Sequence, residues 1–194
     1  MRFTALCYRA LCKKGYNLLD QELIVKSVVD SVKEVFDMML GMEACFEGPI
    51  PDAQKSETGL VSLVGITGEW GGSGVFCCST EFANQLCVSM LGGMMATDTA
   101  GINDEVMDVV AEMTNMMIGN IKNCLEPVTG PLAISVPTVL HGRNFQFRNI
   151  AGLRGTTLGF SAGGGSFEVR IALAPAPETN MVRSKIPILG LAAL

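Results

Sequence analysis

The feature that most constrains the fold of this chain is a repeated pattern, a long amphipathic helical segment followed by two β-rich runs. Helical spacing of apolar residues extends over 20–40 and again over 104–125, and the β-rich runs occupy 61–79 and 156–172. In each of these regions the two runs meet at a Gly-Gly-Ser sequence, which is typical of a turn. A duplicated helix-plus-hairpin unit can bury its apolar surface when its strands share one sheet and its helices pack on that sheet. We therefore predict an α+β fold with a largely antiparallel sheet.

Capping residues, glycines and prolines set the boundaries of the predicted elements. Asp20 is expected to be the N-cap of the first helix and Gly41 its end, while Thr80 is expected to cap the short helix 81–91. Residues 42–57 are expected to form a loop, and Glu-Trp-Gly-Gly at 69–72 a hairpin turn longer than two residues. In chain order, the prediction is helix 20–40, strands 59–67 and 73–79, helices 81–91 and 104–125, and strands 132–140, 155–162 and 166–174. The domain organisation that follows is an N-terminal extension (1–18), one domain (19–177) and a C-terminal tail (178–194).

The composition excludes several classes of protein. Apolar residues make up 48% of the 194 residues and charged residues only 17%, so the chain is globular and large enough for a sound core. A net charge of −5 argues against nucleic acid as a partner, because phosphate binding needs a basic patch. No apolar run approaches the roughly 20 residues that span a bilayer, and the first residues do not resemble a signal peptide. We therefore expect a cytoplasmic protein with no membrane partner.

Residues of the usual catalytic and metal-binding kinds are scarce. His141 is the single histidine, which leaves almost nothing for a zinc cluster or for a Ser-His or Cys-His pair. The seven cysteines contain no Cys-x-x-Cys pair and are expected to be small buried apolar residues in a reducing compartment. Gly163-Gly164-Gly165 is expected in a hairpin turn, so it is a poor phosphate-binding loop. We expect no metal site and no cofactor of the protein's own.

The helix predicted over 104–125 carries an unusual polar stripe. Its apolar side is formed by Val106, Val110, Met113, Met117, Ile121 and Cys124, and its polar side by Asp108, Glu112, Asn115, Gly119 and Lys122. Asparagine and glycine are poor choices for a helix interior, and glycine costs about 1 kcal/mol against alanine. This face is either an ordinary solvated surface or one on which a partner docks closely.

The wider sequence context favours docking. Glu112 and Asn115 are preceded by Asp108 and followed, 22 residues after Asn115, by Pro137. This combination resembles the signature of the CheC/CheX/FliY family of chemotaxis phosphatases, and most closely its CheX branch. The resemblance covers about residues 19–174. It implies a CheC/CheX-like fold and dephosphorylation of a phosphorylated response regulator of the CheY type.

The resemblance also implies roles for the residues of the stripe. Asn115 would orient the attacking water through its amide, and Glu112 would pair with the regulator's active-site lysine. Gly119 would leave room for docking, Lys122 would lie near the edge of the contact, and the regulator would supply Mg²⁺. Asp108 either has a supporting role in docking or only stabilises the surface of the helix. Asn120 either supports docking or hydrogen-bonds within the fold.

The sequence also leaves open a competing function and leads to expectations for the first helix and for the oligomeric state. The competing function is a non-catalytic module that binds the regulator, like the flagellar switch proteins that share this fold. The first helix repeats the spacing of the stripe as Asp30, Glu34 and Asp37, but the carboxylate in place of the amide would repel a phosphoryl group, so we expect a solvated face there. A homodimer formed through sheet edges is also expected.

Overall fold

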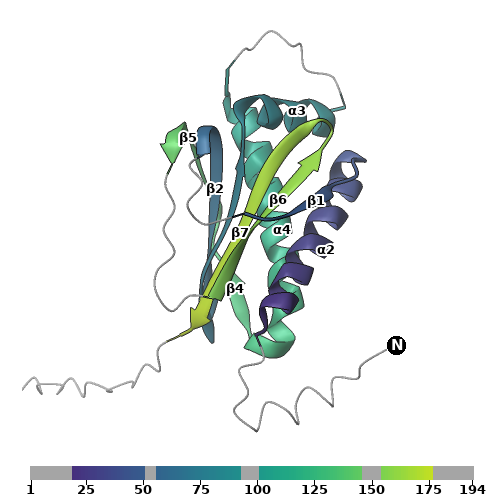
Figure 1. The fold of residues 1–194 in the computed structure, drawn as a ribbon. Helices are drawn as coiled ribbons and strands as arrows, with labels where there is room; N and C mark the ends of the chain where they lie inside the picture. Colours follow the sequence, from purple (N-terminus) through teal and green to yellow (C-terminus); the bar gives the residue numbers. More distant parts are fainter. Residues whose placement is uncertain (1–18, 51–55, 93–100, 146–153, 177–194) are drawn as a thin grey trace, which may run out of the picture.

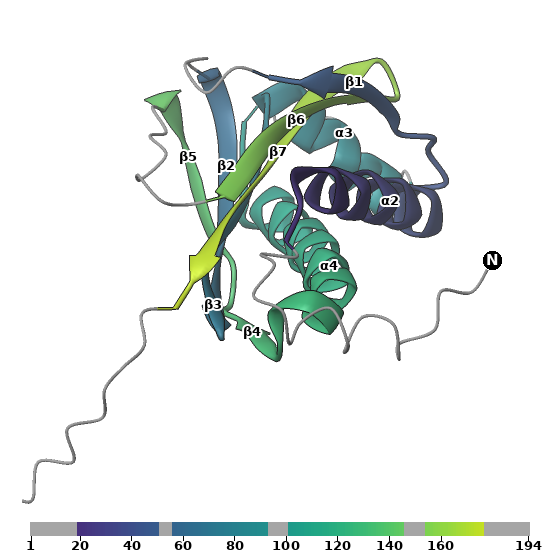
Figure 2. The same ribbon diagram turned by 60° about the horizontal axis from the view of Figure 1, so that its bottom comes forward.

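The computed structural model describes residues 19–50, 56–92, 101–145 and 154–176, and these form an α+β domain (Figure 1). Within them a seven-stranded antiparallel sheet carries three helices on one of its faces (Figure 2), which confirms the predicted fold class. The elements are α2 (Gln21–Leu40), β1 (Cys45–Pro49), β2 (Ser56–Gly68), β3 (Trp70–Cys78), α3 (Thr80–Met90), α4 (Asp104–Thr129), β4 (Leu132–Ile134), β5 (Thr138–Phe145), β6 (Arg154–Ala162) and β7 (Gly165–Pro175). The predicted extension 1–18 and tail 178–194 lie outside the described residues.

The sheet shows how the two units of the repeat combine. Its order is β1-β6-β7-β3-β2-β4, and β5 also pairs with β2, so the hairpins β2–β3 and β6–β7 meet at the centre through β3 and β7. The strands that follow each long helix pair with the hairpin of the other unit. β1, which follows α2, pairs with β6 of the second hairpin, and β4 and β5, which follow α4, pair with β2 of the first. Each unit therefore completes the sheet of the other.

The helix ends follow the predicted caps with one correction. α2 ends at Gly41, whose φ of 59° suits glycine and whose N–H donates to the Asp37 carbonyl. Asp20 occupies the N-cap position of α2, but its side chain makes no capping hydrogen bond to the first turn. The prediction that Thr80 caps α3 is wrong, because Ser79 Oγ accepts from the backbone N–H of Phe82 at 3.1 Å and Thr80 is the first helical residue.

Two strand predictions also need correction. Residues 42–57 are not a loop throughout, because 45–49 form β1 and β2 already begins at Ser56. β1 was missed because Gly48 and Pro49 are poor strand formers and its partner lies more than 100 residues away. The β2–β3 turn is longer than two residues, as predicted, since the ladder ends at Ile66 and Gly72. However, Gly72 lies inside β3, where a Cβ would overlap the Ala172 carbonyl of β7.

The core lies between the sheet and the helices, and its centre is a stack of aromatic rings. Phe167 of β7 stacks on Phe36 of α2 with ring centroids 4.6 Å apart, and on Phe82 of α3 at 5.5 Å. Phe76 and Phe160 bring β3 and β6 into the same group, each with its centroid within about 5.5 Å of Phe167. This cluster holds α2 and α3 on the sheet.

The helices of the described residues include none with the length and apolar character of a membrane span.

Candidate active site

α4 is the helix that carries the predicted site, and its position is set at both the N-terminus and the buried face. Asn103 caps it by accepting from the N–H of Val106 at 3.0 Å. Four of the predicted apolar residues, Val110, Met113, Met117 and Ile121, are fully buried. At Gly74 of β3 a Cβ would overlap the side chain of Ile118, so the glycine lets the helix lie close on the sheet.

The structure corrects the predicted end of α4 and one residue of its buried face. The helix continues to Thr129 instead of ending at residue 125, with Pro127 in its last turn. Cys124 is exposed, so it does not belong to the buried stripe, which passes from Ile121 to Leu125 instead. Leu125 is four residues after Ile121 and Cys124 is three. On a helix the residue four positions further on lies closer to the same face, so Leu125 is the one that is buried.

Glu112 and Asn115 lie on the face of α4 that points away from the core. They are three residues apart and therefore neighbours on the helix surface. Glu112 is exposed and Asn115 half-buried, and Asp108, one turn earlier, is exposed. In the part of the chain that the structure describes, none of these three side chains has a hydrogen-bond or ion-pair partner. The carboxylate and the amide are thus accessible to a second molecule.

Gly119 follows on the same face, where the fold has room for a larger residue. A Cβ there would meet the Cδ1 atom of Ile134 in β4 at 3.8 Å, an ordinary van der Waals distance. Packing among the described residues therefore does not require glycine at this position, although glycine lowers the stability of the helix.

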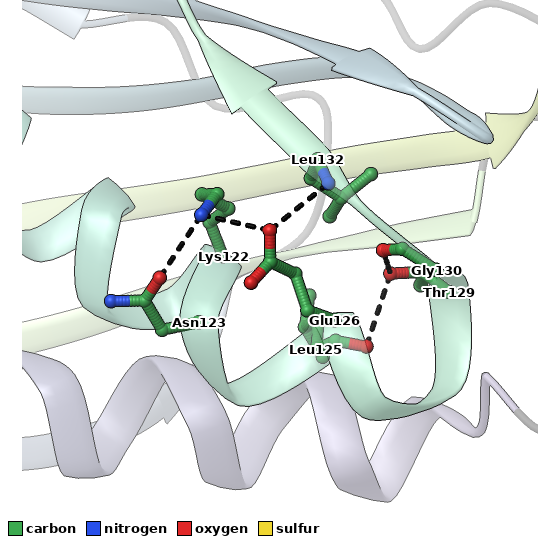
Figure 3. A network of polar contacts seen from close by, with 7 residues as sticks. All are labelled: Lys122, Asn123, Leu125, Glu126, Thr129, Gly130 and Leu132. Carbon is green, nitrogen blue, oxygen red and sulfur yellow. Dashed lines mark hydrogen bonds and ion pairs between the residues drawn. The ribbon is translucent and has the colours of Figure 1, made fainter.

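The other two predicted residues make contacts within the fold. Asn120 Nδ2 donates to Glu34 Oε2 of α2 at 3.4 Å, in line with the alternative that this side chain hydrogen-bonds internally. Lys122 Nζ lies 2.8 Å from Glu126 Oε1 and donates to Asn123 Oδ1 at 3.0 Å (Figure 3). Lys122 is seven residues beyond Asn115, roughly 10 Å along the helix axis.

Glu126 connects this end of α4 to the sheet. Besides its ion pair with Lys122, Glu126 Oε1 accepts from the backbone N–H of Leu132, the first residue of β4, at 3.0 Å (Figure 3). The hydrogen bond from Lys122 and the bond from Leu132 lower the pKa of the Glu126 carboxyl. Lys122 and Glu126 therefore fix the start of β4 beside α4.

The strand predicted over 132–140 is divided by a β-bulge. Ile134 pairs with Ile66 and Thr138 with Leu63, so three residues (135–137) face two residues of β2. Pro137 lies in this bulge on an edge of the sheet, where its missing N–H breaks no ladder. The bulge begins directly after Ile134, the neighbour of Gly119, so it borders the polar face of α4.

Comparison with known proteins identifies the family of this chain. The family described as chemotaxis phosphatase CheX matches residues 60–161, more than half of the chain, a range that includes Glu112, Asn115 and Pro137. The chain belongs to the CheX family. A curated relative, the CheY-P phosphatase CheX of Thermotoga maritima, is 28% identical over 134 residues, which cover 65% of this chain and 80% of the relative.

Solved CheX structures share the fold. The chemotaxis protein CheX of Vibrio vulnificus superposes with a TM-score of 0.65 at 24% identity, covering 77% of this chain and 95% of that one. CheX from the Borrelia burgdorferi complex described as CheX-CheY-BeF3-Mg²⁺ gives a TM-score of 0.58 at 20% identity, with coverages of 77% and 97%. At these identities the likeness concerns the fold.

A pocket elsewhere on this CheX-family chain is poorly suited to phosphate. It measures about 620 Å³, lies among β1, β3, β6, β7 and the start of α3, and has no α4 residue in its lining. Among the described residues its charged lining consists of Glu47, Glu81 and Glu168, with no lysine or arginine, and these three carboxylates would repel a phosphate group. Glu112 and Asn115 do not line this pocket but lie on the outward face of α4, and an open helix face suits a protein partner better than a small molecule.

The five cysteines in the described part of the chain divide into two groups, and Cys7 and Cys12 lie outside it. Cys77, Cys78 and Cys87 are buried, as predicted, and burial raises the pKa of the Cys77 thiol to about 12. The prediction is wrong for Cys45 and Cys124, which are exposed. Among the described residues there is no group of three or more His, Cys, Asp or Glu side chains that could hold a metal ion.

Proposed function

We propose that this chain accelerates hydrolysis of the aspartyl phosphate of a CheY-like response regulator. The observation that carries the proposal is the Glu112/Asn115 pair, accessible and without partners among the described residues, on a helix of a CheX-family fold. Support comes from the relatives: the Thermotoga protein is named a CheY-P phosphatase, and the Borrelia structure is a complex of CheX with CheY.

Asn115 would supply the group that acts on the attacking water. Hydrolysis of an acyl phosphate needs a water held in line with the bond that breaks and neutralisation of charge on the phosphoryl oxygens. The amide of Asn115 can accept a hydrogen bond from this water and donate one, whereas a carboxylate can only accept. On an exposed helix face the side chain can enter the shallow active site of a docked receiver.

Glu112 would set the register of docking by pairing with the receiver's active-site lysine. The receiver would also bring Mg²⁺ to its own phosphoryl group, so the phosphatase supplies neither metal nor nucleophile. Asp108 and Gly119 would border this contact. Lys122 would lie at its edge while it remains paired with Glu126, 2.8 Å away.

The test is the decay of a phosphorylated CheY-type receiver from the same genome, with and without the protein. Asn115→Ala should reduce the stimulated rate about a hundredfold, the cost of losing one group that stabilises the transition state. Asn123→Ala is the matched control, since Asn123 is an exposed asparagine of α4 two turns further on, and it should stay within twofold. Binding of the receiver without faster decay would instead identify a non-catalytic interaction module.

We also propose that the protein is a homodimer joined through a sheet edge. Among the described strands, β6 and β7 lie inside the sheet, whereas β5 has a single pairing partner, β2, and therefore lies at an edge. β5 is the better template of the two edges because β1 is short and contains a bulge and Pro49. Light scattering should give about twice the 20.6 kDa chain mass, and a monomer at micromolar concentration would reject the dimer.

We further propose that the protein acts in the cytoplasm, where its receiver is found.

A further inference from the structure

Val136 is the most exposed large apolar side chain among the described residues, at 84% of its surface. Single exposed apolar residues are common and need no explanation by themselves. Val136 differs because it occupies the middle of the three-residue bulge between β4 and β5. Bulges often redirect a side chain near a functional site.

Hydrogen bonds hold this bulge in one conformation. The N–H of Ser135 donates to the Gly65 carbonyl at 2.9 Å, and the N–H of Gly65 donates to Ser135 Oγ, also at 2.9 Å. The hydroxyl thus replaces the backbone carbonyl that a regular strand would offer to Gly65. Ser135 Oγ in turn donates to the Val136 carbonyl at 2.9 Å. With Pro137 next along the chain and its φ fixed, Val136 is presented on a rigid segment.

The bulge is continuous with the polar face of α4. Ile134, two residues before Val136, lies 3.8 Å from the position that a Cβ of Gly119 would take. Two residues of extended chain span at most about 7 Å. A partner that covers Asn115 and Gly119 therefore reaches the neighbourhood of Val136 without any change in the fold.

We propose that Val136 is an apolar docking contact for the receiver, at the border of the surface formed by Glu112, Asn115 and Gly119. This inference rests on the proposed function. The partner must present an apolar side chain next to its phosphorylated aspartate. Val136 contributes to binding and not to chemistry, because a valine can neither orient water nor neutralise charge.

The experiment separates binding from chemistry. Val136→Ser should raise KM for the phosphorylated receiver about tenfold, as expected for loss of one buried valine, and leave kcat within twofold. Titration calorimetry with the Mg²⁺- and BeF3⁻-loaded receiver should show the same loss of affinity. Leu140→Ser is the matched control, since Leu140 is 49% exposed on the same edge and pairs with Val61, on the sheet face opposite the helices.

Each outcome is decisive. An unchanged KM in the Val136 variant, with an active wild-type protein, overturns the inference and leaves the proposed function intact. A changed mass in light scattering with an unchanged KM also overturns it, because Val136 would then contact a second copy of the chain. Inactivity of the wild-type protein toward the receiver rejects the proposed function, and the docking contact with it. Thermal unfolding of Val136→Ser and of the milder Val136→Ala confirms that both variants fold.

Discussion

Replacement of Gly119 by alanine should increase the stability of the protein and decrease its activity. In a helix interior alanine is more favourable than glycine by about 1 kcal/mol. The new methyl group would lie 3.8 Å from Ile134 Cδ1, close enough for attraction and too far for a clash. For a domain of this size, 1 kcal/mol corresponds to a rise in Tm of about 2–4 °C.

The same methyl group projects toward the proposed receiver. If it holds the receiver backbone about 1 Å away from α4, the water bound by Asn115 leaves its line with the phosphoryl group, and the stimulated rate falls about 10- to 100-fold. Asn123→Ala is the control, because it also improves helix propensity on α4 but lies beyond the docking face.

Calorimetric unfolding and receiver dephosphorylation, measured on the same preparations, check the prediction for Gly119→Ala. A lower Tm would show that the space beside Ile134 is smaller than the structure indicates. A higher Tm with unchanged activity would remove Gly119 from the receiver contact, and the reasoning about its role would be refuted.

Three further predictions concern other charged residues. Glu112→Lys should weaken receiver binding by about 2–5 kcal/mol in calorimetry, since it leaves a docked lysine unpaired, and an unchanged affinity would contradict the proposed register. The Glu34→Ala/Asp37→Ala double variant should keep the dephosphorylation rate within about twofold, because both side chains lie on the exposed face of α2, and a large loss in a folded variant would give that face a function. Glu126→Gln should destabilise the protein more at pH 7 than at pH 3, because the lowered pKa of the Glu126 carboxyl stabilises the fold above its ordinary value of 4.5 and this contribution is lost as the pH falls through the folded-state pKa. Urea unfolding at the two pH values tests it, and an equal effect at both would reject the role of the Lys122 pair.

Sequence periodicity was sufficient for the two faces of α4 from Val106 to Ile121, although not for the end of the helix or for Cys124. A helix repeats every 3.6 residues, so the spacing of Val110, Met113 and Met117 already determines that Glu112 and Asn115 point the other way. The glycine that ends α2 and the two-residue turn at Gly163 and Gly164, with φ of 55° and 85°, are equally local. Each of these features depends on residues within a few positions of one another along the chain.

Long-range pairing could not be obtained in this way. The pairing of β1 with β6, the division of 132–140 at the bulge, and the position of β6 and β7 inside the sheet depend on segments far apart in the sequence. Periodicity does not specify which strand lies beside which, or in what register.

The α+β class and the outward residues of α4, Glu112 and Asn115 among them, thus follow from patterns that are local in the sequence. The tertiary structure supplies the neighbours of that face. It pairs Lys122 with Glu126, joins Asn120 to Glu34, and brings the bulge that carries Val136 next to Gly119. The physical reason is that the face of a helix is fixed by its own backbone geometry, whereas its neighbours are fixed by contacts between segments that meet only when the whole sheet has formed.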